Sequence, residues 1–323
     1  MFSSTDEQEW RGAFTFVQAA DTQLGFMSDP TWSKTMEPCG DGSDWSEEID
    51  LVHQMVRCIN SMTPLPRFLC VCGDLVHALP DAQWGPNNPS AARYTNELFS
   101  KKQNADFKHA MEALKVPLIC CCGNHDVGDR PTPASLEKYR SLYGKDYYGF
   151  WCGGMRALVV NVQLMADGRD AVEEQAQQSR WLALELEALA EARDGSCLQP
   201  KQQPKHVIMF QHIPWFLKSQ SEPDEGYFNM PLSWRDEWIP KLQAAGISKV
   251  FCGHYHRNNI AYSDDGELEI VVTSAVGRQM SAAEVIVDAP LPGPSDIKSG
   301  MRIVHVSEDN ISHEYIQFDD WDT

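Results

Sequence analysis

The stretch "VPLICCCGNHD", residues 116–126, joins an apolar run directly to three polar residues. The apolar run predicts a buried strand, and the glycine ends it just before Asn124, His125 and Asp126. Its three cysteines raise the question of a thiol site. A zinc site made of thiolates needs spaced pairs such as C-x₂-C, and the sequence contains none. We therefore interpret the cysteines as small apolar residues packed beneath a strand end that delivers polar ligands.

Four other predicted strands end in the same way. The segments are "AADTQLG" with Asp21 and Gln23, "CGDLVH" with Asp74, "FQHIP" with His212, and "CGHYH" with His254 and His256. The carboxyl ends of strands in an α/β sheet share one rim, where sites in such folds usually form. The mixture of carboxylate, amide and imidazole donors fits a pair of divalent cations better than a single structural zinc ion.

Strand and helix patterns alternate along most of the chain, which predicts an α/β fold with buried sheets. The predicted strands are 14–20, 67–73, 116–123, 156–163, 205–212, 249–254, 268–276 and 302–306, and the predicted helices are 44–60, 96–114, 134–143, 173–192 and 233–245. "DDG" at Asp264 indicates a hairpin and hence a mixed sheet, or two packed sheets. We expect one domain over 1–323, with a motif-bearing core at about 12–280 and surface insertions at 31–44, 77–92 and 215–238.

Composition limits the classes of partner and the compartment. The formal net charge is −19, from 27 basic and 46 acidic residues, which disfavours binding to nucleic acid or to anionic membranes. No apolar stretch is long enough to span a membrane. The first residues lack the pattern of a signal peptide, so the ten cysteines are expected to be reduced and the protein cytoplasmic.

The five blocks, taken in order, resemble the calcineurin-like metallophosphoesterase superfamily. Its pattern is D-x-H, G-D-x-x-[DNH], G-N-H-[DE], a lone H, and G-H-x-H. This chain shows "DTQ", "GDLVH", "GNHD", "QHIP" and "GHYH". The resemblance implies a sandwich of two mixed β-sheets flanked by helices, and hydrolysis of phosphoesters at a dinuclear metal centre by a water that the cations acidify. The segments "GDLVHALP", "GNHDVGDRPT", "FQHIPWFL" and "GHYHRN" are most similar to a cytosolic branch of serine/threonine protein phosphatases.

The resemblance also implies roles for individual residues. Asp74 is expected to bridge two cations. The other expected ligands of one cation are Asp21, Gln23 and His256, and those of the second cation are Asn124, His212 and His254. Asn124 and His125 are expected to bind the substrate. His125 is expected to hydrogen-bond the phosphoryl group or protonate the leaving group, with Asp126 orienting its imidazole. His77 is expected to support the loop or the ligands.

Gln23 departs from the family pattern, which usually has histidine there. A neutral amide oxygen is a harder and weaker ligand than imidazole, so this site is expected to favour Mn²⁺, Mg²⁺ or Fe²⁺ over Zn²⁺. Alternatively, Gln23 hydrogen-bonds a water on the cation. The identity of the two divalent ions, Mn, Fe, Mg or Zn, stays open on the sequence.

Alternatives to a protein phosphatase remain at this stage. The same ligand set serves a small-molecule phosphodiesterase or a nucleotide phosphatase, and a metal-bound scaffold without catalysis is a third interpretation. The segment 215–238 carries six aromatic residues around Glu222, Asp224 and Glu225. Its aromatic residues either pack inward or form a lid whose carboxylates accept a phosphosite flanked by basic residues.

Overall fold

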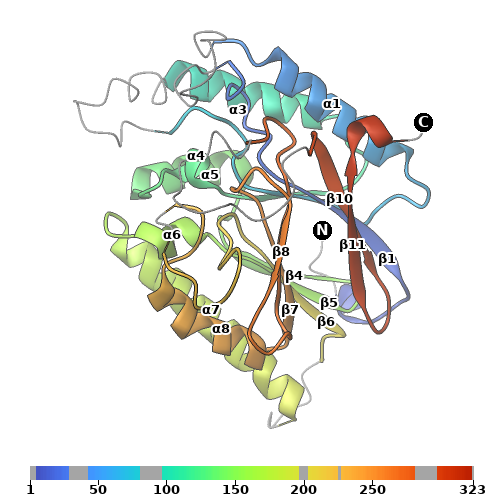
Figure 1. Ribbon diagram of the computed structural model, residues 1–323, viewed down its shortest axis with the longest axis vertical. Coiled ribbons are helices and arrows are strands. Elements are labelled where there is room, and N and C mark those ends of the chain that lie inside the picture. Colours follow the sequence, from blue (N-terminus) through green and yellow to red (C-terminus); the bar gives the residue numbers. More distant parts are fainter. Residues whose placement is uncertain are drawn as a thin grey trace.

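Two mixed β-sheets form the centre of the protein in the computed structural model, which describes residues 5–28, 43–80, 97–195, 203–224, 227–280 and 297–321 (Figure 1). The first sheet has the strand order β11-β10-β1-β2-β3. Its strands are β1 (Phe14–Ala19), β2 (Leu69–Cys72), β3 (Leu118–Cys121), β10 (Gly300–Val306) and β11 (Ile311–Gln317). The strands β1, β2 and β3 run parallel, whereas β10 and β11 are antiparallel neighbours. The carboxyl ends of β1, β2 and β3 therefore lie at one edge.

The second sheet has the order β4-β5-β6-β7-β9-β8. Its strands are β4 (Tyr148–Cys152), β5 (Met155–Val159), β6 (His206–Phe210), β7 (Ile247–Cys252), β8 (Asn259–Tyr262) and β9 (Glu269–Val272). The strands β5, β6, β7 and β9 run parallel, and β4 and β8 flank them antiparallel. This parallel set brings the carboxyl ends of β6 and β7 to a common edge.

Successive side chains of a strand point to opposite faces of its sheet. The apolar side chains therefore form three layers, one between the two sheets and one between each sheet and its helices. In β1, Phe16 points between the two sheets, whereas Val17 and Ala19 face the helices. In β6, Ile208 and Phe210 point between the sheets, and their neighbours face the other helix layer. Phenylalanines fill the space between the sheets, with the rings of Phe16 and Phe210 5.8 Å apart. Burial of both faces explains why these strands read as continuous apolar runs.

Helices cover the outer face of each sheet (Figure 1). On the first sheet lie α1 (Ser46–Ser61), α3 (Glu97–Met111) and α5 (Pro133–Tyr143), and on the second lie α7 (Val172–Asp194) and α8 (Leu232–Ala244). The short elements are η1 (Thr5–Gln8), α4 (Asn124–Val127), α6 (Val162–Asp167) and η2 (Phe318–Asp320). The predicted sandwich of two mixed β-sheets flanked by helices is therefore confirmed.

The structure corrects one predicted strand and adds detail to two predicted segments. Residues 156–163 do not form one strand, because β5 ends at Val159 and Asn161 caps α6 by accepting a hydrogen bond from Gln163 N at 3.2 Å. Beyond the predicted motif-bearing core at about 12–280, β10 and β11 complete the first sheet. In the predicted insertion 215–238, Trp215 and Trp238 are buried beneath the second sheet, whereas most of 218–224 is exposed or half-buried.

The other two predicted insertions lie largely outside the described residues, which leave out 29–42 and 81–96. The described start of the second one, 77–79, is buried. The hairpin predicted at Asp264 is present, since β8 and β9 pair antiparallel around it. Among the described helices, none is both long and apolar enough to cross a lipid bilayer.

A buried carboxylate at the amino end of β9 connects the two sheets. Glu269 of β9 contacts Lys249 Nζ of β7 and lies 3.0 Å from His313 Nε2 of β11. Burial alone would raise the pKa of Glu269, but the hydrogen bonds from His313 and Lys249 outweigh it and lower the pKa to about 2. This pKa is below the ordinary value of 4.5, so the ion pairs stabilise the fold above that pH and lose their effect as pH falls towards 2.

We expect Glu269→Gln to lower the free energy of unfolding by about 1–2 kcal/mol at pH 7, after allowance for solvent screening. The gap between parent and variant should close as pH falls from about 4.5 to about 2. Urea unfolding at pH 7, 4 and 3 measures it, with the exposed Glu267→Gln as control. A gap that does not change with pH would contradict this account of the ion pairs.

Candidate metal centre

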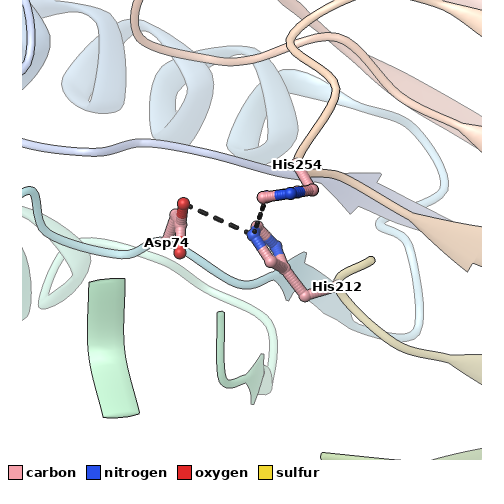
Figure 2. A group of neighbouring side chains, drawn as sticks. All are labelled: Asp74, His212 and His254. Carbon is pink, nitrogen blue, oxygen red and sulfur yellow. Dashed lines mark hydrogen bonds and ion pairs between the residues drawn. The ribbon is translucent and has the colours of Figure 1, made fainter. Parts of the chain in front are cut away.

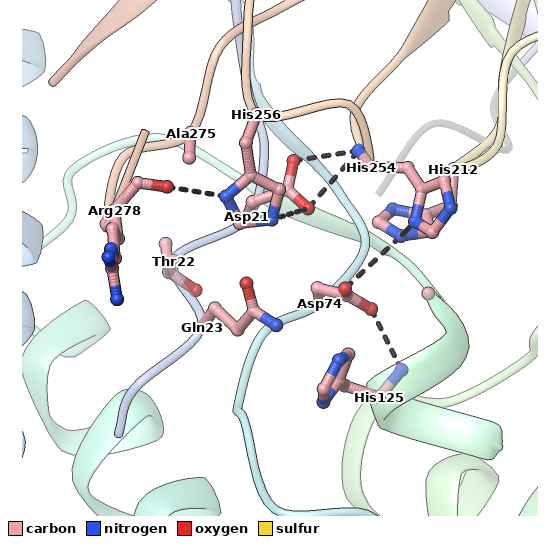
Figure 3. Close-up of polar contacts among 12 residues, drawn as sticks. Asp21, Thr22, Gln23, Asp74, His125, His212, His254, His256, Ala275 and Arg278 are labelled. Carbon is pink, nitrogen blue, oxygen red and sulfur yellow. Dashed lines mark hydrogen bonds and ion pairs between the residues drawn. The ribbon is translucent and has the colours of Figure 1, made fainter. Parts of the chain in front are cut away.

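The loops that follow β1, β2, β3, β6 and β7 meet where the carboxyl edges of the two sheets come together (Figure 3). Hydrogen bonds join the two sheets there. His254 N donates to Asp21 Oδ2 at 3.0 Å, and His212 Nδ1 donates to the carbonyl oxygen of Cys72 at 2.7 Å. Each bond links a residue of one sheet to a residue of the other. The loops predicted from the sequence to carry ligands therefore form one buried centre.

Two groups of potential ligand atoms share Asp74. Asp74, His212 and His254 each offer an atom within 4.8 Å of the others (Figure 2), and so do Asp21, Asp74 and His256. His212 Nε2 lies 3.3 Å from Asp74 Oδ2 and 3.1 Å from His254 Nδ1. His256 Nε2 lies 3.4 Å from Asp21 Oδ1. The division into two groups agrees with the one that the family resemblance implies.

The three imidazoles are held with one nitrogen facing the centre. In each ring, the outer nitrogen donates to a backbone carbonyl oxygen, so the inner nitrogen is the one that faces the centre. These bonds run from His212 to Cys72, from His254 to Tyr227 and from His256 to Arg278. A donor on the outer nitrogen fixes the tautomer of a metal-binding histidine and raises its basicity.

Burial and mutual charge shift the pKa values of these groups strongly. Burial lowers the pKa of His254 to about 3 and that of His256 to about 4, with the charge of His212 adding to the effect. Burial also opposes a charge on His212, yet the carboxylates of Asp74 and Asp21 raise its pKa to about 10. Burial would raise the pKa of Asp74, but His212 and His125 hold it well below its usual range. The carboxylates of Asp74 and Asp21 therefore stabilise a positive charge next to the inner nitrogen of His212. A bound cation would supply such a charge.

Backbone strain marks the same residues. Among the described residues other than glycine, positive φ angles occur only at five predicted ligands: Asp21 (52°), Gln23 (39°), Asp74 (50°), His254 (68°) and His256 (53°). Each such residue costs on the order of 1–3 kcal/mol, and strain of this kind clusters at functional sites. The fold therefore holds all five of these predicted ligands in a strained backbone conformation.

The side-chain oxygens of Gln23 and Asn124 complete the donor set. Gln23 Oε1 is buried without a hydrogen-bond partner, and Figure 3 shows it turned towards Asp21 and His256. Asn124 Oδ1 lies 3.2 Å from His212 Nε2. A buried carbonyl oxygen that accepts no hydrogen bond is costly unless a cation takes that place. The set of carboxylate, amide and imidazole donors therefore fits two divalent cations.

Glycines permit the close approach of the ligand loops. A Cβ atom on Gly123 would lie 2.1 Å from Asp74 Oδ1 and 2.4 Å from Asp74 N. A Cβ atom on Gly73, whose φ is +86°, would lie 2.4 Å from His212 Nδ1. The glycines of the C-G-D and C-G-N-H segments are thus needed because a ligand occupies the space of their missing side chains.

We expect Gly123→Ala to displace the Asp74 carboxylate and reduce the amount of bound metal, with a loss of stability of about 1–3 kcal/mol from overpacking. Metal analysis after dialysis and thermal unfolding measure the two effects. Gly144→Ala is the control for metal content, because nothing lies within 4 Å of the added carbon there, although its φ of +87° makes alanine cost stability on its own. A Gly123→Ala protein with a full metal complement would contradict the tight packing of this loop on Asp74.

The interaction expected between Asp126 and the His125 imidazole is absent. His125 Nδ1 donates to the carbonyl oxygen of His77 at 2.6 Å. The Asp126 carboxylate instead accepts from Leu75 N at 3.0 Å and from Gly123 N at 2.8 Å. Residue 126 begins the second half of the short helix α4, so its side chain turns back onto the loop. The expectation that Asp126 orients His125 was therefore wrong, and Asp126 braces the two loops that carry Asp74 and Asn124.

Three residues at this centre were not predicted from the sequence as ligands or as substrate-binding residues: His77, Asp129 and Tyr227. Asn124 Nδ2 donates to Asp129 Oδ1 at 2.8 Å and to Tyr227 OH at 3.3 Å. The ring of His77 stacks on that of His125, with centroids 4.8 Å apart. Asp129 and His77 lie within a few residues of predicted ligands, which is a usable signal. Nothing in the sequence places Tyr227 there, because it arrives from a distant loop.

The acidic residues of 215–238 serve the loop itself. Glu222 accepts from the backbone nitrogens of Leu217 and Lys218 at 2.8 and 2.6 Å, and Asp224 pairs with Arg235 at 3.0 Å. Trp215, Phe216 and Trp238 are buried. Inward packing is found for Trp215, Phe216, Phe228 and Trp238, whereas Tyr227 and Trp234 are half-buried. The contacts of Glu222 and Asp224 within the loop favour inward packing over a lid that recognises basic residues. Glu225 lies outside the described residues.

The cysteines pack as predicted. Cys70 and Cys72 point between the sheets beside Cys121, and Cys122 and Cys252 lie in the outer apolar layers. They are buried as free thiols directly beneath the ligand loops. Small side chains at these strand ends let the two sheets approach closely under the centre.

Comparison with known proteins agrees with this geometry. Residues 14–258 match the family model described as calcineurin-like phosphoesterase. The mouse serine/threonine-protein phosphatase CPPED1 is 37% identical over 321 residues, which cover 99% of this chain and 88% of that protein. Purple acid phosphatase PPD1 from yellow lupin has a similar fold, with a TM-score of 0.61 at 15% identity over 99% of this chain and 54% of that chain.

A dimetal phosphatase from Danio rerio also shares the fold, with a TM-score of 0.58 at 15% identity over 95% of this chain and 97% of that chain. The residues matched by the family model include every loop that brings a potential ligand to the centre, from Asp21 to His256. Because the family model matches residues 14–258 and the mouse relative is 37% identical over almost the whole chain, the chain belongs to the calcineurin-like phosphoesterase family and is a phosphoester hydrolase.

Proposed function

We propose that this enzyme removes phosphate from phosphoserine and phosphothreonine in proteins, at a centre of two divalent cations. The observation that carries the proposal is the convergence of inward-facing ligand atoms on the shared carboxylate of Asp74. The preference for a protein monoester is supported by the mouse relative, whose name is that of a serine/threonine-protein phosphatase and which matches almost the whole chain.

In this proposal Asp74 would contribute to the binding of both cations. Asp21, Gln23 and His256 would hold one of them, and Asn124, His212 and His254 would hold the other. Two cations bound in this way would polarise the phosphate oxygens and acidify a water for in-line attack on phosphorus. A bridging carboxylate also offsets the repulsion between two like charges.

His125 and Asn124 act on the substrate. The Nδ1–H of His125 is held by the carbonyl oxygen of His77, so Nε2 is the nitrogen left to exchange a proton with the leaving oxygen. His125 N donates to Asp74 Oδ1 at 2.9 Å, which keeps the residue against the centre. These contacts support the proposal that His125 and Asn124 would meet the phosphoryl group beside the cations.

The amide oxygen of Gln23 supports a preference for Mn²⁺, Mg²⁺ or Fe²⁺ at one position. Carboxylate and amide oxygens suit harder cations, whereas Zn²⁺ favours imidazole and thiolate. Add-back of each metal to chelated enzyme tests this preference. Rescue of activity by zinc alone would count against it.

A panel of phosphate esters tests the substrate class. We expect turnover of phosphoserine and phosphothreonine peptides to exceed that of bis-p-nitrophenyl phosphate and of nucleotides. A nucleotide phosphatase would need an accessible aromatic ring to stack the base. Trp215, Phe216, Phe228 and Trp238 are buried, so among the described aromatic residues of 215–238 Tyr227 is the one that reaches the centre. Preference for the diester or for nucleotides would overturn the proposal. No turnover of any ester by metal-loaded protein would favour the scaffold.

We also propose that the enzyme acts in a reducing compartment such as the cytoplasm. This is supported by the free thiols of the eight described cysteines, among them the close group of Cys70, Cys72 and Cys121. Neighbouring thiols stay reduced where glutathione and thioredoxin are active. Fractionation of cells that express the tagged full chain would test the location.

A further inference from the structure

Both side-chain amides of the centre have their NH₂ groups held by neighbours. A side-chain amide has an acceptor end and a donor end, and only the oxygen can bind a cation. Asn124 donates from Nδ2 to Asp129 Oδ1 at 2.8 Å, which leaves Oδ1 near His212. Gln23 has its Nε2 3.3 Å from His77 Nδ1, which leaves Oε1 buried and without a hydrogen-bond partner. Each amide is thus oriented by the contacts of its NH₂ group.

The contact at Gln23 pairs a donor with an acceptor. In the orientation seen, the NH₂ group donates to His77 Nδ1, and the proton of the imidazole then lies on Nε2. An amide rotated by half a turn would turn its NH₂ group towards the cation, and with the proton of His77 on Nε2 its oxygen would also face the lone pair of Nδ1. The Nε2–H tautomer of His77 therefore favours the orientation in which the oxygen faces the cation.

The imidazole of His77 is itself held firmly. Its ring lies between Phe26, with centroids 5.1 Å apart, and His125, with centroids 4.8 Å apart. Its backbone nitrogen donates to Leu24 O at 3.1 Å, and the residue is 4% exposed. The acceptor that Gln23 meets is thus fixed by stacking and by the backbone, independently of the amide.

We propose that His77 is a positioning residue that holds Gln23 Oε1 towards the cation shared with Asp21, Asp74 and His256. The proposal rests on the dinuclear centre of the proposed function. It explains how a weak neutral ligand can serve where the family usually has histidine. An unrestrained amide would need to give up rotational freedom to bind the cation, and the contact with His77 has already removed that freedom.

Two variants separate the hydrogen bond from the ring. His77→Phe keeps an aromatic ring between Phe26 and His125 but has no acceptor. His77→Asn loses the ring but places a carbonyl oxygen near the position of Nδ1. We expect His77→Phe to weaken binding of one of the two cations by about 10–100-fold, as for other residues that orient metal ligands. His77→Asn should retain most of the affinity.

The measurement is calorimetric titration of chelated protein with Mn²⁺, together with metal content after dialysis. A cycle with Gln23→His adds a second test, because an imidazole ligand has no amide to orient. In the Gln23→His background, His77→Phe should cost little further affinity, so the two changes are expected to be non-additive.

The outcomes separate this proposal from the proposed function. A parent protein that binds no pair of cations would remove the dinuclear centre. A parent that binds two, with unchanged affinity in His77→Phe, would overturn the role of His77 alone. Equal weakening in His77→Phe and His77→Asn would also overturn it, because an acceptor at the position of Nδ1 would then fail to preserve the affinity. If His77→Phe does not fold, comparison of His77→Ala with His77→Asn asks the same question.

Discussion

Asp74→Asn is expected to lose at least one of the two bound cations and about a thousandfold in kcat/KM. Asp74 belongs to both groups of ligand atoms, with Oδ2 3.3 Å from His212 Nε2 and Oδ1 2.9 Å from His125 N. Asparagine keeps one oxygen but turns an NH₂ group to one cation, and the anionic bridge between the cations is lost. Loss of electrostatic stabilisation of about 4 kcal/mol corresponds to that factor in rate.

Metal analysis after dialysis and steady-state kinetics on a phosphopeptide measure both effects. Asp264→Asn provides the matched control, because it removes an exposed carboxylate at the β8–β9 turn without touching the centre. Circular dichroism checks that both variants fold. If Asp74→Asn kept two equivalents of metal and lost less than about tenfold in rate, the bridging role would be wrong.

His125→Gln is expected to keep both cations and lose about 10²–10⁴-fold in kcat on a phosphoserine peptide, the range typical of a lost general acid. The loss should be smaller for p-nitrophenyl phosphate. Its leaving group is a stable anion that departs without a proton, whereas the alkoxide of serine needs one. Glutamine can still hydrogen-bond a phosphoryl oxygen, so the comparison isolates proton transfer from substrate binding.

The exposed His109→Gln is the control for this variant. Equal losses on both substrates would assign His125 to binding of the phosphoryl group alone. Activity like that of the parent would remove His125 from the reaction. Together with Asp74→Asn, this experiment separates residues that hold cations from residues that act on the substrate.

The sequence was most informative where several signals coincide. The strand ends at Asp21, Asp74 and Asn124 each combine an apolar run with polar residues, and parallel strands must place such ends at one edge. Strands with weaker patterns escaped prediction, as with β4 and β11. These lie at the edges of their sheets, where one side of the strand is partly exposed and the apolar signal is diluted.

The assignment of neighbours within the centre could not be made from sequence. Asp126 follows His125 directly, yet its carboxylate turns to Leu75 N and Gly123 N because a short helix sends successive side chains in different directions. The aromatic residues of 215–238 likewise could be assigned to core or surface only once the second sheet and α8 were in place. Packing of this kind depends on contacts between residues far apart in the chain, so it cannot be predicted from the local sequence.

By itself, the sequence determined the strand–helix alternation, the order of ligand-bearing loops and the chemical type of each ligand. These depend on local periodicity and on residue identity, which are readable along the chain. Only the tertiary structure decided which ring nitrogen of each histidine faces the centre, which contact orients Gln23 and Asn124, and what Asp126 supports. Those choices depend on hydrogen bonds between residues far apart in the chain, such as His212 to Cys72, and arise only when the two sheets come together.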